Sequence, residues 1–132
     1  MNTLSGQISS VETKGSLSLV KLQVEDIILT TIVIDTPETA RFLQAGNAVK
    51  ALFKETEVVL SLDAKQAISI ENRLIGTIET IEQGDLLVKV VLQIGTLSIS
   101  SIITTESFNA LNLASGAQVT ALIKSNEIML SH

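Results

Sequence analysis

The chain has 132 residues, the size of one ordinary domain, and a formal net charge of −5. This acidity argues against duplex DNA as a partner, because a protein that binds a polyanion needs a basic surface. Aromatic residues make up only 2% of the chain, which argues against single-stranded nucleic acids and sugars, since their sites use aromatic stacking.

Cysteine and histidine usage removes further classes of site. The chain has no Cys and its only His is His132, which excludes thiolate chemistry, a catalytic histidine and a histidine-rich metal site. The N-terminal stretch lacks the charged-then-apolar pattern of a secretory signal. No apolar run reaches the ~18 residues of a membrane helix. We therefore expect a soluble cytoplasmic protein.

Segments rich in Val, Leu and Ile with partial alternation predict strands, and glycines predict the turns between them. Gly15 and Gly84 are expected in hairpin turns. The predicted strands, in chain order, lie at 15–24, 26–34, 48–60, 85–94, 96–104 and 118–130.

Two short helices are expected between strands, at 36–46 and 104–116. In the first, Thr36 is a candidate N-cap, Pro37 suits the first helical position and Gly46 follows the end. In the second, Thr104 or Thr105 is the candidate cap, and Gly116 the terminator.

The chain contains an internal duplication with an offset of 70 residues. "VKALFKETEVVL" at 49–60 aligns with "VTALIKSNEIML" at 119–130, and six of the twelve positions are identical. Gly46 and Gly116, Gly6 and Gly76 keep the same offset. One register over so long a span indicates two copies of one unit.

We place repeat 1 at 1–62, a linker at 63–68 and repeat 2 at 69–132. Several strands and one short helix in such a unit predict an all-β fold with short helices, arranged as two tandem OB-like β-barrel domains. Each unit is small for independent stability. Many strand residues are apolar on both faces, so packing between the copies and between chains is expected to cover them.

Catalytic constellations are absent, and the carboxylates are scattered, so we predict no catalytic residues and no cation-binding metal site. What recurs in both copies is a set of groups that suit an anion. Lys54 and Lys124 interrupt apolar strands at equivalent positions, and each helix start carries hydroxyls: Thr36 and Thr39, Thr104 and Ser107. A small tetrahedral dianion suits such neutral donors with one or two cations. Solvated lysines and simple helix caps are the structural alternative.

Repeat 2 carries an ordered set of residues with a characteristic spacing: Asn72, Leu74, Gly76, Ile78, Ile103, Thr104, Glu106, Ser107, Leu111, Leu113, Gly116, Val119, Ala121, Ile123, Lys124, Ser125, Glu127 and Ile128. In this set the sequence resembles the Mop/TOBE family of molybdate-binding domains. Repeat 1 is similar but looser, and the resemblance covers almost the whole chain.

This resemblance implies OB-like barrels that exchange strands and bind molybdate or tungstate between domains. The oxyanion-binding candidates that it implies are Lys124, Ser125, Thr104, Ser107, Lys54, Thr36, Thr39, Arg73 and Asn72. Glu71 stands where the family often has an Arg, with Arg73 as a substitute two residues on. Glu55 stands where a small residue usually follows the Lys. We therefore expect fewer or weaker sites than in a family member that matches the pattern fully. We expect the stretch around Lys124 to bind the ligand and the stretch around Lys54 to be structural.

The leading functional prediction is a cytoplasmic, non-enzymatic protein that stores or buffers molybdate or tungstate. It would be a homo-oligomer, with a trimer favoured over a dimer, and would have no membrane or direct nucleic-acid partner. The alternative is an oxyanion-sensing module of a molybdate-responsive transcription regulator or ABC transporter. An OB-like nucleic-acid binder is a third reading, which the acidity and the lack of aromatic residues disfavour.

Overall fold

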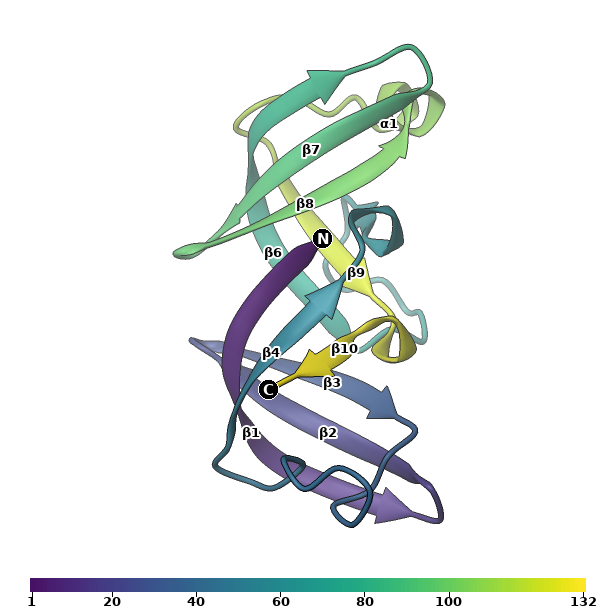
Figure 1. Cartoon of the computed structure of the whole chain (residues 1–132). Coiled ribbons are helices and arrows are strands. Elements are labelled where there is room, and N and C mark those ends of the chain that lie inside the picture. Colours follow the sequence, from purple (N-terminus) through teal and green to yellow (C-terminus); the bar gives the residue numbers. More distant parts are fainter.

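The computed structural model describes residues 1–132, and ten strands form two five-stranded sheets (Figure 1). The first copy contributes β1 (Asn2–Lys14), β2 (Leu17–Val24), β3 (Ile27–Val33), β4 (Ala48–Phe53) and β5 (Val59–Ser61). The second copy contributes β6 (Asn72–Gln83), β7 (Leu87–Ile94), β8 (Leu97–Thr104), β9 (Gln118–Ile123) and β10 (Met129–Ser131). The helices are α1 (Thr105–Leu111) and two 3₁₀ turns, η1 (Glu55–Glu57) and η2 (Ser125–Glu127). No helix in the structure has the length and hydropathy needed to cross a membrane.

Each sheet is built around one long, bent strand. The first half of β1 pairs with β4 and its second half pairs with β2, with a bulge between Ile8 and Ser10. Strand β6 repeats this arrangement with β9 and β7, and its bulge lies between Ile78 and Thr80. A bulge increases the local twist, which lets a single strand serve two parts of a curled sheet. The prediction of two tandem OB-like barrels is confirmed.

Gly76 lies where β6 passes close to the end of β7. A Cβ added at Gly76 would lie 2.8 Å from Ile94 Cγ1 and 2.9 Å from the Gln93 carbonyl oxygen. Gly6 occupies the equivalent place in the first copy, where a Cβ would lie 2.7 Å from the Gln23 carbonyl oxygen. Only glycine fits this close approach of backbones, which explains its recurrence in both copies.

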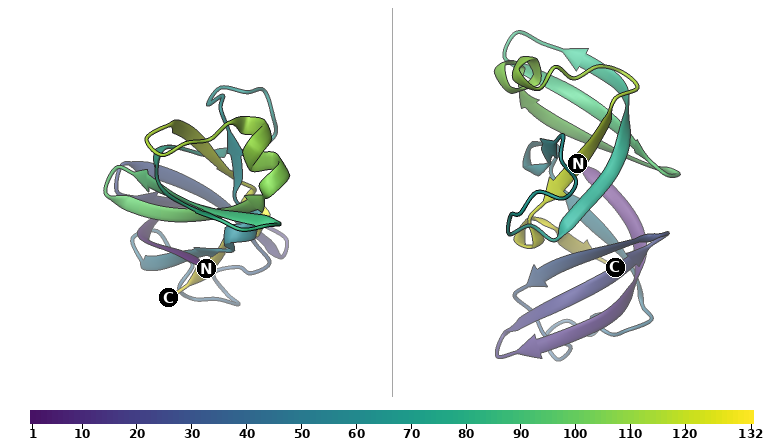
Figure 2. Two further views of the ribbon diagram at one scale, coloured as in Figure 1. Left: turned by 90° about the horizontal axis from the view of Figure 1, so that it is seen from above. Right: turned by 180° about the vertical axis from the view of Figure 1, so that it is seen from behind.

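The two copies exchange their last strands. The sheet orders are β10-β4-β1-β2-β3 and β5-β9-β6-β7-β8, so that β5 of the first copy completes the sheet of the second, and β10 completes the sheet of the first. In Figure 1 and in the right-hand view of Figure 2 the barrels lie one above the other, and in Figure 1 β10 (yellow) lies beside β4 in the lower barrel. The segments 48–60 and 118–130, each predicted as one strand, are therefore each divided by a 3₁₀ turn.

One hydrophobic core runs through both copies. A single cluster of 25 buried apolar residues includes members from every strand except β10, whose Leu130 packs against the cluster. Phe53 and Val58 lie on either side of η1, and Ile123 and Ile128 lie on either side of η2. All four residues are at most 2% exposed. Each copy alone has few residues with which to build a core. Because the two copies share one core, each is stabilised by apolar residues of the other.

The two predicted helices have different outcomes. In the second copy α1 forms, and Thr104 caps it by accepting a hydrogen bond from the Ser107 amide at 3.1 Å. It ends at Leu111, earlier than predicted, where Asn112 adopts a left-handed conformation with φ of 50°.

The predicted helix over 36–46 is wrong. Only isolated turns form, and in the first of them the Thr39 and Ala40 amides both donate to the Thr36 carbonyl. Thr39 Oγ1 accepts from the Thr36 amide at 2.8 Å and donates to the Asp35 carboxylate at 3.1 Å. These side-chain bonds offer the backbone an alternative to helical bonding. Leu43 is the only fully buried residue of the segment, so little apolar burial favours a longer helix.

Candidate oxyanion-binding site

Lys54 and Lys124 stand where the chain leaves one barrel for the other. We call 53–59 the first crossing and 123–129 the second crossing. Each lysine has extended backbone and precedes a 3₁₀ turn, which its carbonyl closes by accepting a hydrogen bond at 3.0 Å from the amide of Glu57 or Glu127. Both lysines are exposed, and neither forms an ion pair within the chain. Their ammonium groups are therefore available to an anion.

Buried hydroxyl groups hold the two crossings in place. Thr31 Oγ1 donates to the Ile128 carbonyl at 2.6 Å, and Ser101 Oγ donates to the Val58 carbonyl at 2.7 Å. Thr31 and Ser101 are both fully buried and lie on β3 and β8, against which η2 and η1 pack. Each crossing is thus attached to the barrel that it enters.

Asn72, a predicted oxyanion ligand, has its side chain fully engaged inside the protein. Its Nδ2 donates to the carbonyls of Thr30 and Ile123 at 2.8 and 3.0 Å, and its Oδ1 accepts from the Thr30 amide at 2.7 Å. Asn2, at the equivalent position, donates from its Nδ2 to the Ser100 carbonyl and accepts at its Oδ1 from the Ser100 amide. Because an amide has two donor hydrogens, Asn72 keeps no free donor for a ligand, and it clamps β6 to β3 of the other copy.

Arg73, the predicted substitute for a family arginine, holds the linker. Its Nε donates to the Ile70 carbonyl at 2.9 Å and its Nη2 to the Ile68 carbonyl at 2.9 Å. Its Nη1 donates to the carbonyls of Ala64 and Gln66. All three guanidinium nitrogens are therefore engaged by backbone oxygens, and the side chain fastens segment 64–70 to β6.

Because the last strands are exchanged, the predicted hydroxyl residues of the second copy lie beside the crossing of the first copy. Thr104 and Ser107 line a cavity of about 560 Å³ together with Thr56 and Val58 of the first crossing, not with Lys124 and Ser125 of their own copy. In the sequence Thr104 and Lys124 both belong to repeat 2, which predicts that they share one site. The structure places Thr104 beside the crossing of repeat 1, since that crossing supplies the last strand of the second barrel.

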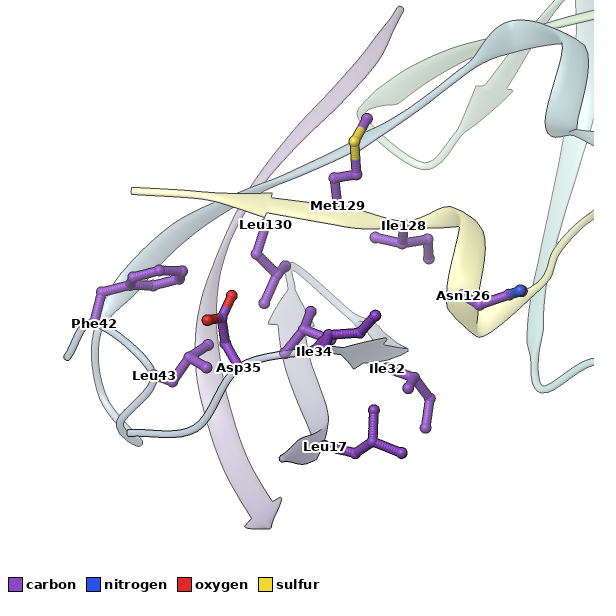
Figure 3. Close-up of a pocket in the computed structure, with 11 residues that line it drawn as sticks. Leu17, Ile32, Ile34, Asp35, Phe42, Leu43, Asn126, Ile128, Met129 and Leu130 are labelled. Carbon is purple, nitrogen blue, oxygen red and sulfur yellow. The ribbon is translucent and has the colours of Figure 1, made fainter. Parts of the chain in front are cut away.

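The equivalent cavity of the first barrel has a volume of about 550 Å³ and is shown in Figure 3. Its walls are mostly apolar, with Asp35 and Asn126 as the polar members. Thr36 and Thr39 do not line it, because they are bonded to each other in the exposed turn. The structure thus does not bring these two hydroxyls to the second crossing.

Glu55, Lys89 and the Met1 amino group form a charge cluster. Glu55 was singled out in the sequence, but Lys89 was not. Glu55 Oε1 lies 3.0 Å from the amino group of Met1, and Oε2 lies 3.5 Å from Lys89 Nζ on β7. The hydrogen bond from the Met1 ammonium lowers the pKa of Glu55; partial burial opposes this shift, and the charge of Lys89 adds to it. Lys89 interrupts the apolar run "LLVKVV", the same signal that marked Lys54 and Lys124.

The fold and the two crossings define a class, the strand-exchanged tandem OB-like barrel, and comparison with known proteins identifies the family. The TOBE domain model matches residues 68–130. The chain is 32% identical to the molybdenum-pterin-binding protein MopA of Rhodobacter capsulatus over 126 residues, which cover 90% of this chain and 48% of MopA. It is 29% identical to the molybdenum transport protein ModE of Herbaspirillum seropedicae over 98% of this chain and 49% of ModE. The chain thus spans about half the length of these curated relatives.

A solved structure matches nearly the whole chain. This structure is the cytoplasmic molybdate-binding protein ModG with molybdate bound, which superposes with a TM-score of 0.91 and 31% sequence identity and covers 98% of this chain and 94% of that one. The chain belongs to the Mop/TOBE domain family. The family resemblance read from the sequence is therefore confirmed.

Proposed function

We propose that this chain is a cytoplasmic binding protein for molybdate or tungstate that serves storage or homeostasis and catalyses no reaction. The observation that carries the proposal is the match to the molybdate-bound ModG structure over 98% of the chain. The exposed Lys124, followed by Ser125, adds a cation and a hydroxyl donor at a turn that the Thr31 hydroxyl attaches to β3. Charge-assisted hydrogen bonds of this kind are the strong ones toward a dianion.

We further propose that the site is completed by a second copy of the chain in a homo-oligomer, with a trimer favoured over a dimer. Large apolar side chains are exposed at equivalent positions of both copies: Leu17 and Leu87 are 47% and 53% exposed, and Met129 and Val59 are 46% and 52% exposed. They border the two equivalent cavities. Exposed apolar patches that recur in both halves support burial between chains.

The second candidate function is the oxyanion-sensing module of a regulator or transporter. The similarity to ModE over 98% of this chain favours it, because that relative is about twice as long as the aligned part. The full-length gene separates the two functions. An adjoining DNA-binding or ATPase segment supports the sensing module, and a gene that encodes only these two repeats supports the storage protein.

The storage proposal is tested by thermal unfolding with molybdate, tungstate, sulfate and phosphate. A ligand that binds only the folded state raises its stability by about 2.7 kcal/mol at a hundred times its Kd. We expect molybdate and tungstate to raise Tm and sulfate and phosphate to do so less. Unchanged Tm at millimolar molybdate contradicts the proposal.

Lys124→Ala tests the assigned residue, with Lys65→Ala in the linker as the matched control. Removing a charged donor costs roughly 1.5–3 kcal/mol of binding, which is tenfold or more in Kd. We expect isothermal titration to show this loss in K124A and none in K65A. Equal Kd values in the two variants contradict the role of Lys124, and light scattering gives the oligomeric state in the same samples.

A further inference from the structure

The two crossings are equivalent in backbone but differ at the residue that follows the lysine. Ser125 follows Lys124, whereas Glu55 follows Lys54. Both residues begin a 3₁₀ turn of the same length, and both are partly buried. A carboxylate therefore stands in the first crossing where the second has a small hydroxyl.

The Glu55 carboxylate is held between cations from both copies. Oε1 accepts a hydrogen bond from the Met1 amino group at 3.0 Å, and Oε2 lies 3.5 Å from Lys89 Nζ. Oε2 is buried and has no hydrogen-bond partner, although the oxygens of a carboxylate accept several bonds. The side chain is only 19% exposed, compared with 38% for Lys89. A surface glutamate would be free to extend into water, but this one is turned inward.

Lys89, the side-chain cation of this cluster, is specific to the first crossing. The residue at an offset of 70 from Lys89 is Leu19, which is not a cation. The first crossing thus has beside it a lysine that the other copy does not repeat and, in Glu55, a carboxylate of its own. Positive groups gathered around an inward-facing anion are the arrangement that a bound oxyanion requires.

We propose that the Glu55 carboxylate is an internal anion that fills the first crossing, so that a small tetrahedral oxyanion binds there only after this carboxylate is removed. The inference rests on the proposed oxyanion-binding function. It gives the chain one open site, at the second crossing, and one latent site, at the first. A dianion brought beside an ionised Glu55 meets repulsion, and Lys89 is already paired with that carboxylate.

Glu55→Ser, which copies Ser125, tests the latent site by equilibrium dialysis with tungstate and elemental analysis of the bound metal. Glu57→Ser is the matched control, because Glu57 lies in the same turn and forms no ion pair. We expect E55S to bind one more tungstate per chain than the wild type, and E57S to bind the same number as the wild type. Adding Lys89→Leu to E55S should remove the gain.

A purely structural role for the cluster gives a different pattern. E55S would then unfold at a lower temperature and bind no additional tungstate, which overturns the proposal, as does an equal gain in E57S. An amide NMR titration of the wild-type protein gives a second measurement that needs no variant. Tungstate should shift the resonances of Lys124 and Ser125, and shifts of equal size at Lys54 and Glu55 overturn the proposal.

The oxyanion-binding function and the latent site at Glu55 can be refuted independently of each other. If the wild type binds tungstate and E55S gains nothing, the latent site is wrong and the binding function stands. If the wild type binds no tungstate and E55S binds one, the binding function fails and the internal-anion role of Glu55 stands.

Discussion

Replacing Asn72 by Ala separates a structural clamp from a ligand residue. The family resemblance makes Asn72 a candidate for holding the oxyanion, whereas the structure uses its amide to join β6 and β9 to β3. The side chain is 1% exposed and makes three hydrogen bonds, two to Thr30 and one to Ile123. Truncation leaves all three backbone groups without this partner.

The expected loss of stability follows from these three bonds. At about 1 kcal/mol net for each, N72A should lower the free energy of unfolding by about 3 kcal/mol. For a chain of this size that corresponds to a fall in Tm of roughly 12 °C. Asn2→Ala removes two equivalent bonds to Ser100 and should cost about 2 kcal/mol. Asn47→Ala is the control, because its exposed amide makes a single bond to the Phe42 carbonyl.

The assay is urea unfolding, followed by circular dichroism, in buffer freed of molybdate and tungstate. The clamp predicts that N72A is destabilised without any ligand and that N47A changes by less than about 1 kcal/mol. A ligand role predicts the reverse, with normal stability in oxyanion-free buffer and a smaller rise of Tm on adding molybdate. Wild-type stability of N72A in oxyanion-free buffer would refute the clamp.

Three further substitutions probe other parts of the fold. Gly76→Ala should destabilise the protein by roughly 1–3 kcal/mol in urea unfolding, because the added Cβ would lie 2.8 Å from Ile94 Cγ1; a neutral result would mean that the strands separate at little cost. Glu55→Gln should cost about 1 kcal/mol or less at neutral pH. Because the folded-state pKa of Glu55 is lowered, this difference is present above the ordinary glutamate pKa and disappears as the pH falls through the lowered value, and a constant difference down to acid pH would contradict the ion pair. Thr104→Ala removes the bond from the Ser107 amide and should cost ~1 kcal/mol; an unchanged unfolding midpoint would show that the cap contributes nothing.

The candidate site was only partly predictable from sequence. Lys54 and Lys124 were identified because a charge inside an apolar run is conspicuous, and the structure leaves both exposed at the crossings. The engagement of Arg73 by linker carbonyls has no sequence signal, because any residue can supply a carbonyl. Lys89 carried the same signal as Lys54, but its partner Glu55 comes from the other copy, and pattern reasoning within one copy does not reach it.

The helix prediction shows how side-chain chemistry can override a cap pattern. Thr36 and Thr104 both look like N-caps, and only Thr104 caps a helix. After Thr104 the chain buries Phe108 and Leu113, whereas after Thr36 only Leu43 is buried. Most helical stability in proteins comes from tertiary packing of an apolar face, so the segment that buries more apolar surface keeps its helix.

The sequence by itself determined the duplication, six strand regions and the barrel type, because these depend on periodicity, turn residues and a constant offset of 70 that any reader of the chain can count. The two longest strands, β1 and β6, lie outside the predicted regions. Only the tertiary structure decided that β5 and β10 lie in each other's barrels. The two repeats are nearly alike, so either closing strand can pair with the backbone of either barrel, and backbone hydrogen bonds do not distinguish between copies. The choice depends on distant contacts, namely the Asn2 and Asn72 clamps, the Thr31 and Ser101 hydroxyls and the shared core, and it places Thr104 beside the first crossing.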